Sequence, residues 1–399
     1  MAGSYRPFSA SEQNPENDPA PEPLRATPRT MTTFSITDHR HMARALELAR
    51  RGLTTAHPNP RVGCVLVRDD AVIGEGWHRA AGEAHAEVNA IAAAGGRAED
   101  ATAYVTLEPC ASTGKTGPCT EALIRAGVIR VVFAVDDPSQ HPEGRRSAAF
   151  EQAGIEVVNG LMQAEARKLN EGFLMRISQH RPFVRMKVAA SLDGATAMRN
   201  GESQWITGEP ARQDVQKLRA MSGAIMTGVG TVLADDPRLT VRDTSLVTRQ
   251  PLRVVIDSRL RTPPAARLLA QPGERAVFCT EDHGREALEQ CGAAVYRVAA
   301  DSGRVDLSEV LPKLAELGIN DVLVEAGPGL SGSLLAEGHV DELVIYQAPH
   351  MMGSETMGII TTPGWTALQH RLPLDILDVR RVGRDLKIVA RPAASAGGR

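Results

Sequence analysis

The sequence of 399 residues has few cysteines, no excess of positive charge and no long apolar run. The five cysteines, an odd and sparse set, argue against a disulfide framework and favour a reducing compartment with thiols that can bind metal, so we expect a cytoplasmic protein. The formal net charge is -3, so the chain does not have the excess of Lys and Arg that is typical of nucleic-acid-binding proteins. No apolar run approaches the roughly 20 residues needed to cross a bilayer, so no membrane span is predicted.

The composition that remains is that of an ordinary globular protein, with 42% hydrophobic and 23% charged residues. A chain of this length exceeds one ordinary core, so two domains are expected. The first 30 residues are rich in Pro, Glu, Asn and Ser and have no signal-peptide apolar region, which predicts a disordered extension at 1–34. The pattern then predicts a domain at 35–160, a connecting helix at 161–181 and a second domain at 182–393.

The first predicted domain alternates helices and strands. Asp38 is the expected N-cap of a first helix, in which apolar residues recur from Met42 to Ala49 at helical spacing. Strands are predicted at 62–67, 71–77, 103–107, 128–135 and 155–158, and further helices at 85–94, 119–126 and 147–153. These elements predict an α/β sandwich.

The stretch from 85 to 119 contains the residue types of a zinc site. His85 is followed two places later by Glu87, and two proline-preceded cysteines, Cys110 and Cys119, come after them. This is the layout of the zinc nucleobase deaminases. One imidazole and two thiolates leave a tetrahedral position open for water, whose pKa falls to about 7 on zinc. Glu87 is then expected to move protons rather than to bind the metal.

An alternative interpretation of the two cysteines is that they are buried small hydrophobes, as cysteines of soluble proteins usually are. Two features of their context favour the metal. A predicted strand at 103–107 ends just before Cys110, and Pro118 suits the start of a helix, which places Cys119 where a helix N-terminus stabilises a thiolate.

The second predicted domain again alternates strands and helices. Strands are expected at 182–188, 224–227, 252–256, 276–279, 322–325, 342–348 and 386–390, and helices at 209–219, 307–317 and 330–337. Alternation of this kind predicts a mostly parallel sheet. Glycine-rich turns at 227–231 and 327–333 follow two of these strands, and such turns can hold a phosphate on backbone N–H groups. Either turn alone would be interpreted as an ordinary glycine turn, whereas two such turns in one domain favour a nucleotide-binding site.

Both halves of the chain contain runs of residues that resemble the bifunctional pyrimidine deaminase/reductases of riboflavin biosynthesis. In the first half these runs are His57-Pro58-Asn59-Pro60, Gly82-Glu83-Ala84-His85-Ala86-Glu87 and Thr106-Leu107-Glu108-Pro109-Cys110. In the second half they are Ser191-Leu192-Asp193-Gly194, Gly201-Glu202-Ser203-Gln204-Trp205, Ala234-Asp235-Asp236-Pro237 and Val324-Glu325-Ala326-Gly327-Pro328.

This resemblance implies a cytidine-deaminase-like first domain with one Zn²⁺ per chain, which hydrolyses the 2-amino group of 2,5-diamino-6-(5-phosphoribosylamino)pyrimidin-4(3H)-one. It implies a dihydrofolate-reductase-like second domain that uses NADPH to reduce the ribosyl group to ribityl, giving 5-amino-6-(5-phosphoribitylamino)uracil. It also implies a small-molecule substrate, no nucleic acid, no membrane, and a homo-oligomer, either a dimer or a tetramer.

The same resemblance assigns roles to individual positions. Glu87 in the deaminase, and Lys187 and Glu325 in the reductase, are the expected catalytic residues. The residues expected to contact NADPH are Ala189, Trp205, Thr231, Asp235, Ser258, Gly327, Pro328, Gly329, Leu330, Ser331, Gly332 and Ser333. The residues expected to contact substrate are Asn59, Lys115, Ser203, Arg219, Leu239, Arg242 and Glu325. Two of these, Arg219 and Arg242, carry the guanidinium groups that suit a phosphate.

Two positions depart from the family pattern, and both lie in the first domain. Ser112 stands where a histidine is expected, and Ser139 stands where an asparagine is expected. An alternative hypothesis is therefore a reductase whose zinc-binding domain has lost or changed its substrate. A third hypothesis, of another class, is a deaminase-like zinc module that binds a macromolecule, and the negative net charge counts against nucleic acid.

Overall fold

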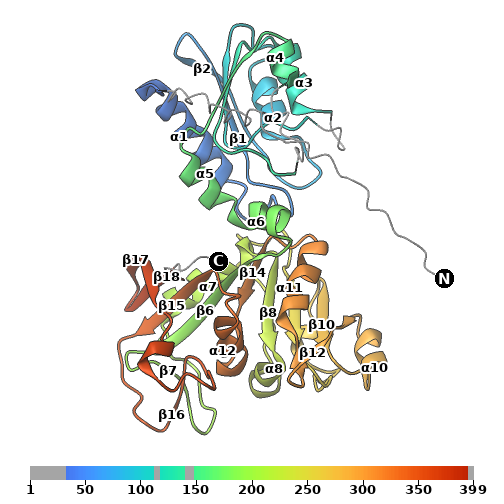
Figure 1. Ribbon diagram of the computed structural model, residues 1–399, viewed down its shortest axis with the longest axis vertical. Helices are drawn as coiled ribbons and strands as arrows, with labels where there is room; N and C mark the ends of the chain where they lie inside the picture. Colours follow the sequence, from blue (N-terminus) through green and yellow to red (C-terminus); the bar gives the residue numbers. More distant parts are fainter. Residues whose placement is uncertain (1–32, 112–116, 140–147, 394–399) are drawn as a thin grey trace, which may run out of the picture. The chain divides into compact units, whose positions relative to one another are not determined.

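The computed structural model describes residues 33–111, 117–139 and 148–393 (Figure 1). The expected disorder before residue 33, and the predicted roles of Lys115 and Ser112, lie outside the described residues. Two main β-sheets are present in the described residues, one of five strands in the N-terminal half and one of nine strands in the C-terminal half. Within the same residues, every helix is too short or too polar to cross a membrane.

The N-terminal sheet has the strand order β2-β1-β3-β4-β5. β1 pairs antiparallel with β2 and β3, whereas β3, β4 and β5 run parallel to one another. The strands are β1 (Gly63–Arg68), β2 (Ala71–Trp77), β3 (Thr102–Val105), β4 (Arg130–Phe133) and β5 (Glu156–Asn159). The five strands predicted from the sequence are confirmed, with ends that move by at most a few residues.

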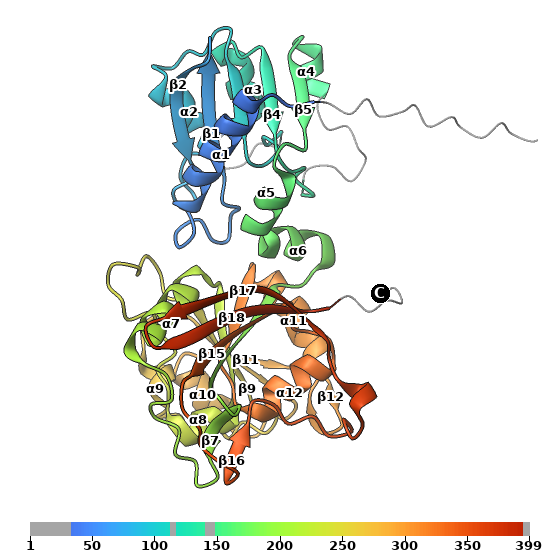
Figure 2. The ribbon, with the colours of Figure 1, turned by 90° about the vertical axis from the view of Figure 1, so that its left-hand side faces the viewer.

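Helices cover both faces of this sheet, as Figures 1 and 2 show. One face packs against α1 (Ile36–Arg50) and α5 (Gln163–Leu169), and the other against α2 (Ala86–Ala93), α3 (Cys119–Ala126) and α4 (Ala148–Gln152). Glycine in β2 allows α2 to lie close to the sheet, because a Cβ on Gly76 would be 2.3 Å from the carbonyl oxygen of Ala86. This close packing holds the start of α2, and with it His85, against the end of β2.

Two local expectations for this half were wrong. Ser35, not Asp38, is the N-cap of α1, and Asp38 completes a capping box by accepting the Ser35 N–H. Where one connecting helix was expected at 161–181, α5 is followed by a separate helix, α6 (Glu171–Gln179). The break falls at Asn170, whose side chain is buried and exchanges two hydrogen bonds with the backbone of Arg61.

The C-terminal sheet has the strand order β11-β10-β9-β8-β14-β6-β15-β18-β17. All neighbouring strands from β11 to β15 pair in parallel. Only β18 pairs antiparallel with its two neighbours, β15 and β17, so the expected mostly parallel sheet is confirmed. The strands are β6 (Phe183–Ser191), β8 (Ala224–Gly228), β9 (Leu252–Ile256), β10 (Arg275–Cys279), β11 (Ala294–Arg297), β14 (Asp321–Val324), β15 (Glu342–Ala348), β17 (Leu374–Val382) and β18 (Asp385–Pro392). β11 and β17 were not expected from the sequence.

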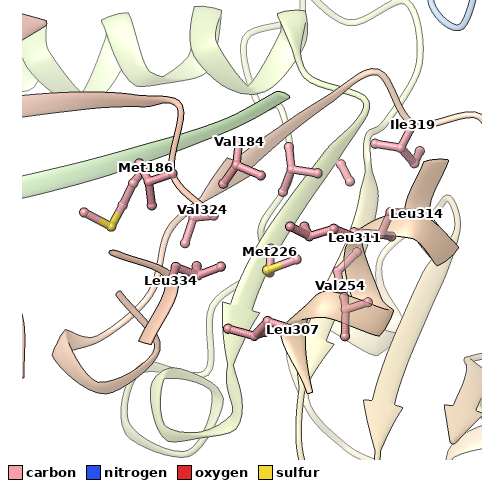
Figure 3. Packing of buried hydrophobic residues seen from close by; sticks show 14 of the residues in the cluster. Val184, Met186, Met226, Val254, Leu307, Leu311, Leu314, Ile319, Val324 and Leu334 are labelled. Atoms are coloured by element: carbon pink, nitrogen blue, oxygen red, sulfur yellow. The ribbon is translucent and has the colours of Figure 1, made fainter. Parts of the chain in front are cut away.

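The largest core of the molecule lies on one face of this sheet (Figure 3). Leu307, Leu311 and Leu314 of α11 (Leu307–Glu316) and Leu334 of α12 (Pro328–Ala336) pack there against alternate residues of the central strands. The opposite face is covered by α7 (Glu209–Met221), α8 (Val229–Asp235), α9 (Arg267–Ala270) and α10 (Arg285–Gln290).

Short elements complete this half. They are the strand pair β7 (Ala195–Met198) and β16 (Thr356–Gly358), the hairpin β12 (Ala300–Asp301) and β13 (Arg304–Val305), and the 3₁₀ turn η1 (Leu368–His370). The parallel strands β6, β14, β8 and β9 are neighbours and end at the same edge of the sheet. In open α/β sheets, ligands bind at that carboxyl edge.

Candidate active sites

The structure brings His85, Cys110 and Cys119 together. One ligand atom from each residue lies within 4.8 Å of the other two, and His85 Nδ1 is 3.2 Å from Cys119 Sγ and 3.5 Å from Cys110 Sγ. Each comes from the end of an element: His85 is the N-cap of α2, Cys110 follows β3, and Cys119 begins α3 after Pro118. An imidazole and two thiolates this close together match the donor set and size of a tetrahedral zinc site with an open position.

The backbone at the start of α3 supports the thiolate form of Cys110. The N–H of Cys119 donates to Cys110 Sγ at 3.3 Å. The hydrogen bond from the Cys119 thiol, together with that from His85, lowers the pKa of Cys110 against the effect of burial, whereas the same thiol–thiol hydrogen bond and burial raise the pKa of Cys119. Metal binding requires deprotonated cysteines, so one ligand is prepared for zinc by the fold itself.

Glu87 is the second residue of α2, two positions after His85, and its side chain is buried. Burial raises the pKa of Glu87 to about 7, and the nearby sulfur of Cys110 acts in the same direction. A carboxyl with such a pKa can both accept and return a proton near neutrality, which is what a proton shuttle requires. The structure therefore places a suitable acid–base group beside the three ligands.

Asn59 faces the same site from the loop before β1. Its Nδ2 lies 3.0 Å from Nε2 of the buried His78, and Nδ1 of His78 lies 3.2 Å from the carbonyl oxygen of Ala84. Because an amide NH₂ can only donate, Nε2 accepts and Nδ1 carries the proton. Sequence reasoning did not single out His78, although it is the first residue after β2, at the start of a loop that could contribute to a site.

Ser139, the second departure from the family pattern, is engaged within its own loop. Its N–H and its hydroxyl both donate to Asp137 Oδ1, at 2.9 and 2.7 Å. Asp137 is buried, and its N–H donates to Glu108 Oε2 next to Cys110. Ser139 therefore stabilises this loop through a turn in which the Asp137 carboxylate takes the place of a backbone carbonyl as the acceptor.

A cavity of about 1060 Å³ lies at the carboxyl edge of the C-terminal sheet. Three charged residues stand together in its wall: Lys187 on β6, Glu325 directly after β14, and Arg219 near the end of α7. Arg219 donates from Nε and Nη2 to the two oxygens of Glu325, at 2.6 and 3.0 Å. The Lys187 ammonium lies 4.0 Å from the same carboxylate.

The electrostatics of this trio define its protonation. Burial would raise the pKa of Glu325, but the charge and hydrogen bonds of Arg219, followed by the charge of Lys187, lower it to about 2. Burial lowers the pKa of Lys187, and Glu325 opposes that effect. Glu325 is therefore a carboxylate at neutral pH, and Lys187 is the member of the trio that is most easily induced to give up a proton.

The two predicted glycine turns meet in this cavity. The N–H of Gly327, the N-cap of α12, donates to Thr231 Oγ1 of α8 at 3.1 Å. A Cβ on Gly332 would lie 2.0 Å from the carbonyl oxygen of Thr361, so this position in α12 requires glycine. The N-terminus of α12 thus faces the cavity with free N–H groups and a favourable dipole, as a cofactor phosphate needs.

Most of the predicted reductase residues line the cavity. They are Lys187, Ala189, Ser203, Arg219, Thr231, Asp235, Leu239, Ser258, Glu325, Gly327, Pro328, Gly329, Leu330, Gly332 and Ser333. The lining does not include Ser331, which is buried inside α12, or Trp205, which is 66% exposed and packs against the guanidinium of Arg212. Arg242 is also outside the lining, but its charge acts on Glu325.

Sequence reasoning missed another part of the wall. Arg261, in the loop after β9, and Arg304, in the β12–β13 hairpin, both line the cavity. The first could have been found from the sequence, because it follows a buried parallel strand at the edge where ligands bind. The hairpin could not, because its two strands have only two residues each and show no apolar alternation.

Comparison with known proteins agrees with this geometry. Residues 35–135 match the cytidine and deoxycytidylate deaminase zinc-binding region, and residues 182–388 match the RibD C-terminal domain. The chain is 48% identical over 360 residues to the riboflavin biosynthesis protein RibD of Escherichia coli, covering 88% of this chain and 98% of that relative. The chain belongs to the RibD family.

Other members of the RibD family show the same coverage of both halves. The RibD of Haemophilus influenzae is 42% identical, over 91% of this chain and 99% of the relative. The structure is similar to that of Acinetobacter baumannii RibD, with a TM-score of 0.84 and 44% identity over 90% of this chain and 99% of the other. It is also similar to the diaminohydroxyphosphoribosylaminopyrimidine deaminase/5-amino-6-(5-phosphoribosylamino)uracil reductase of Thermotoga maritima, with a TM-score of 0.78 and 31% identity over 90% and 99% of the two chains.

Both domains of the RibD family are present in this chain, so it is a bifunctional deaminase and reductase of riboflavin biosynthesis that acts on a small molecule. The expected cytidine-deaminase-like fold of the first half is confirmed, and so is the reductase fold of the second. The family's zinc-binding and reductase domains indicate zinc and a nicotinamide cofactor.

Proposed function

We propose that this chain hydrolyses the 2-amino group of 2,5-diamino-6-(5-phosphoribosylamino)pyrimidin-4(3H)-one and then reduces the ribosyl group of the product with NADPH. The observation that carries the proposal is that one chain contains a His85, Cys110 and Cys119 cluster with a buried Glu87, and a separate cavity with a Lys187, Glu325 and Arg219 trio. We also propose that the protein is cytoplasmic, since all five cysteines are free thiols, and that it is a dimer or tetramer, as the family resemblance implies.

In the deaminase, His85, Cys110 and Cys119 would hold one zinc ion, which when bound supplies a water with a pKa near ~7. Glu87 would take a proton from the attacking water and deliver protons to the ring nitrogen and then to the departing amine. The C2–N bond breaks, ammonia leaves, and a carbonyl remains at C2. Asn59, oriented by His78, would position the pyrimidine with its amide oxygen.

In the reductase, the α12 turn would hold the cofactor phosphates, and NADPH when bound supplies the hydride. Lys187 would give a proton to the sugar ring oxygen as the C1′–O bond breaks, leaving a protonated imine between C1′ and the nitrogen. Hydride addition at C1′ then completes the ribityl amine, and solvent returns a proton to Lys187. Glu325 would hold Lys187 and a sugar hydroxyl in place, and the exposed Arg242 would contact the substrate phosphate.

One experiment tests the whole proposal. Purified protein is incubated with the diaminopyrimidine substrate, with and without NADPH, and each product is identified by mass spectrometry. Ammonia and the uracil product should form without NADPH, and the ribityl product should form only with it. Reduction of supplied uracil substrate without any ammonia release from the diaminopyrimidine would instead support a reductase whose zinc-binding domain has another substrate.

Replacement of Glu87 tests the deaminase separately. Glu87→Gln fills the same buried space but cannot carry a proton, so ammonia release should fall by about 100- to 10,000-fold. Bound zinc and NADPH oxidation with the deaminated substrate should stay at wild-type levels. Glu83→Gln, an exposed change in the loop before His85, is the matched control. Ammonia release near the wild-type rate in Glu87→Gln would remove Glu87 from the mechanism.

Replacement of Glu325 tests the reductase. Glu325→Gln removes the charge that pairs with Lys187, so NADPH oxidation with the deaminated substrate should fall by at least about tenfold, equivalent to ~1.4 kcal/mol of transition-state stabilisation. Ammonia release should not change. NADPH binding, measured by calorimetry, reports whether the domain is still folded, and the exposed Glu355→Gln is the control. A folded variant with unchanged turnover would contradict the role of Glu325.

A further inference from the structure

The reductase cavity has two chemically different ends. Lys187 and Glu325 mark one end, on β6 and just after β14, whereas the other end is formed by the loop after β9 and the β12–β13 hairpin. In the strand order β9-β8-β14-β6, two strand spacings separate β14 from β9, which is about 10 Å. The N-terminus of α12 lies on the cavity wall between them. A dinucleotide with its phosphates at α12 and its reacting ring near Lys187 therefore directs its adenosine toward the far end.

Two loops form the far end, and a hydrogen bond joins them. The hydroxyl oxygen of Ser258, after β9, accepts the N–H of Val305 in β13 at 3.1 Å. This bond leaves the Ser258 hydroxyl proton available to donate to a ligand. Arg261 follows Ser258 by three residues, Arg304 precedes Val305, and both arginines line the cavity. The far end thus carries a serine donor and one arginine from each of the two joined loops.

Of the three arginines at the far end, only one forms an ion pair within the described ranges. Arg259 faces Glu281 at 3.9 Å, whereas Arg261 and Arg304 form no ion pair within the described ranges. Arg304 has only a long contact of 3.5 Å with the Ser333 hydroxyl.

Three acidic residues near the far end have contacts of their own. Asp301 accepts the Ser302 hydroxyl, and Asp306 caps α11. Glu337 lies 3.4 Å from His339, although its charge also acts on Arg304. Arg261 and Arg304 are therefore two cations on this wall that form no ion pair among the described residues and can bind an anion.

We propose that Arg261 and Arg304, with the hydroxyl of Ser258, bind the adenosine 2′-phosphate of NADPH and thereby select NADPH over NADH. A planar guanidinium matches a phosphate with two parallel hydrogen bonds, and nucleotide-binding proteins that use NADP place arginine where NAD-dependent ones place an acidic residue. The inference rests on the proposed NADPH-dependent reductase and specifies which residues recognise the cofactor's extra phosphate.

Calorimetric titration of the full-length protein tests this inference without turnover. The probes are NADP⁺ against NAD⁺, and adenosine 2′,5′-bisphosphate against adenosine 5′-monophosphate, which differ only in the 2′-phosphate. The double variant Arg261→Gln/Arg304→Gln should weaken NADP⁺ and the bisphosphate by at least about tenfold, because charge-assisted hydrogen bonds are lost. Binding of NAD⁺ and of the monophosphate should stay within about twofold of wild type.

Arg267→Gln is the matched control, since Arg267 is exposed on α9 and outside the cavity wall. It should leave all four affinities unchanged. Equal losses for NADP⁺ and NAD⁺ in the double variant, or no loss for either, would overturn the inference while leaving the proposed reductase intact. A wild-type protein that binds neither dinucleotide, or prefers NAD⁺, would overturn the proposed NADPH dependence as well.

Discussion

At the scale of single residues, Arg219 shows how a cavity side chain can also hold a neighbouring charge. It was expected to contact substrate, and it does line the cavity, where three of its five N–H donors bind protein oxygens. Nε and Nη2 bind Glu325, and Nη1 donates to the carbonyl oxygen of Thr240 at 2.9 Å. Arg219 therefore keeps Glu325 ionised and fixed in orientation, in addition to the substrate contact expected of it.

The zinc ligands give the sharpest prediction at this scale. Cys119→Ala removes one of three ligands, and the two that remain should hold zinc too weakly to survive purification. Elemental analysis should then find far less than one zinc per chain. Cys64→Ala is the matched control, because Cys64 is equally buried in the same domain but is not part of the cluster. Full zinc in Cys119→Ala would show that this thiol is not a ligand.

At the scale of elements, one carboxylate anchors α1 to the N-terminal sheet. Asp38 Oδ1 accepts from the Tyr104 hydroxyl on β3 and from Arg130 on β4, each at 2.8 Å, and Oδ2 accepts from Ser35 at the helix start. Burial would raise the pKa of Asp38, but Arg130 and the other donors hold it well below its usual range. The capping box and the tertiary anchor therefore share one side chain.

Asp38→Asn should destabilise α1 by roughly 2 kcal/mol at neutral pH, because it removes the shorter ion pair of Arg130 and leaves only the exposed Glu156 at 3.4 Å. Since the folded pKa is depressed, this stabilisation is complete above the unfolded pKa of about 3.9 and is lost as pH falls toward the folded value. The difference between wild type and variant should thus shrink below about pH 4.

Hydrogen exchange of the α1 amides in the full-length protein measures this effect. Glu47→Gln in the same helix is the control, since Glu47 forms only an exposed ion pair with Arg44, worth at most about 1 kcal/mol. Equal exchange in wild type and Asp38→Asn at pH 7 would show that the carboxylate does not anchor the helix.

At the scale of the whole molecule, the nine-stranded sheet ends in a long, exposed edge strand, β17. β17 pairs with β18 on one side and, within the described residues, with no strand on the other. Eight of its nine residues are exposed, including Ile376 at 65% and Val379 at 54%. An edge strand with exposed apolar side chains can pair with another chain, so we predict that the proposed homo-oligomer forms through β17, which lies beside β18 in Figure 2.

The double variant Ile376→Lys/Val379→Lys should shift the protein toward monomer, because lysines on an edge strand oppose pairing with a second copy. Analytical ultracentrifugation of wild type and variant at equal concentration measures the change. Leu368→Lys is the control, because this leucine is 78% exposed but lies outside the sheet, in η1. An oligomer of unchanged mass in the double variant would place the interface elsewhere.

Residue types and spacing predicted the donor set of the first site and the alternation of strands and helices in both halves. His85, Cys110 and Cys119 could be proposed as ligands because of the His-x-Glu spacing, the apolar run that ends before Cys110 and the proline before Cys119. The strand order, the break at Asn170 and the exposed β17 could not. A break inside a continuous helical pattern depends on a partner more than 100 residues away, here Arg61.

The roles of the charged residues in the second site follow from long-range contacts. Arg219 and Glu325 are 106 residues apart, and no local pattern predicts that they form a buried pair. Arg261 and Arg304 likewise line one cavity because the loop after β9 is joined to the β12–β13 hairpin through Ser258. Side-chain type and spacing follow from the sequence, whereas protonation and ligand contact depend on burial and long-range neighbours, which the fold alone creates.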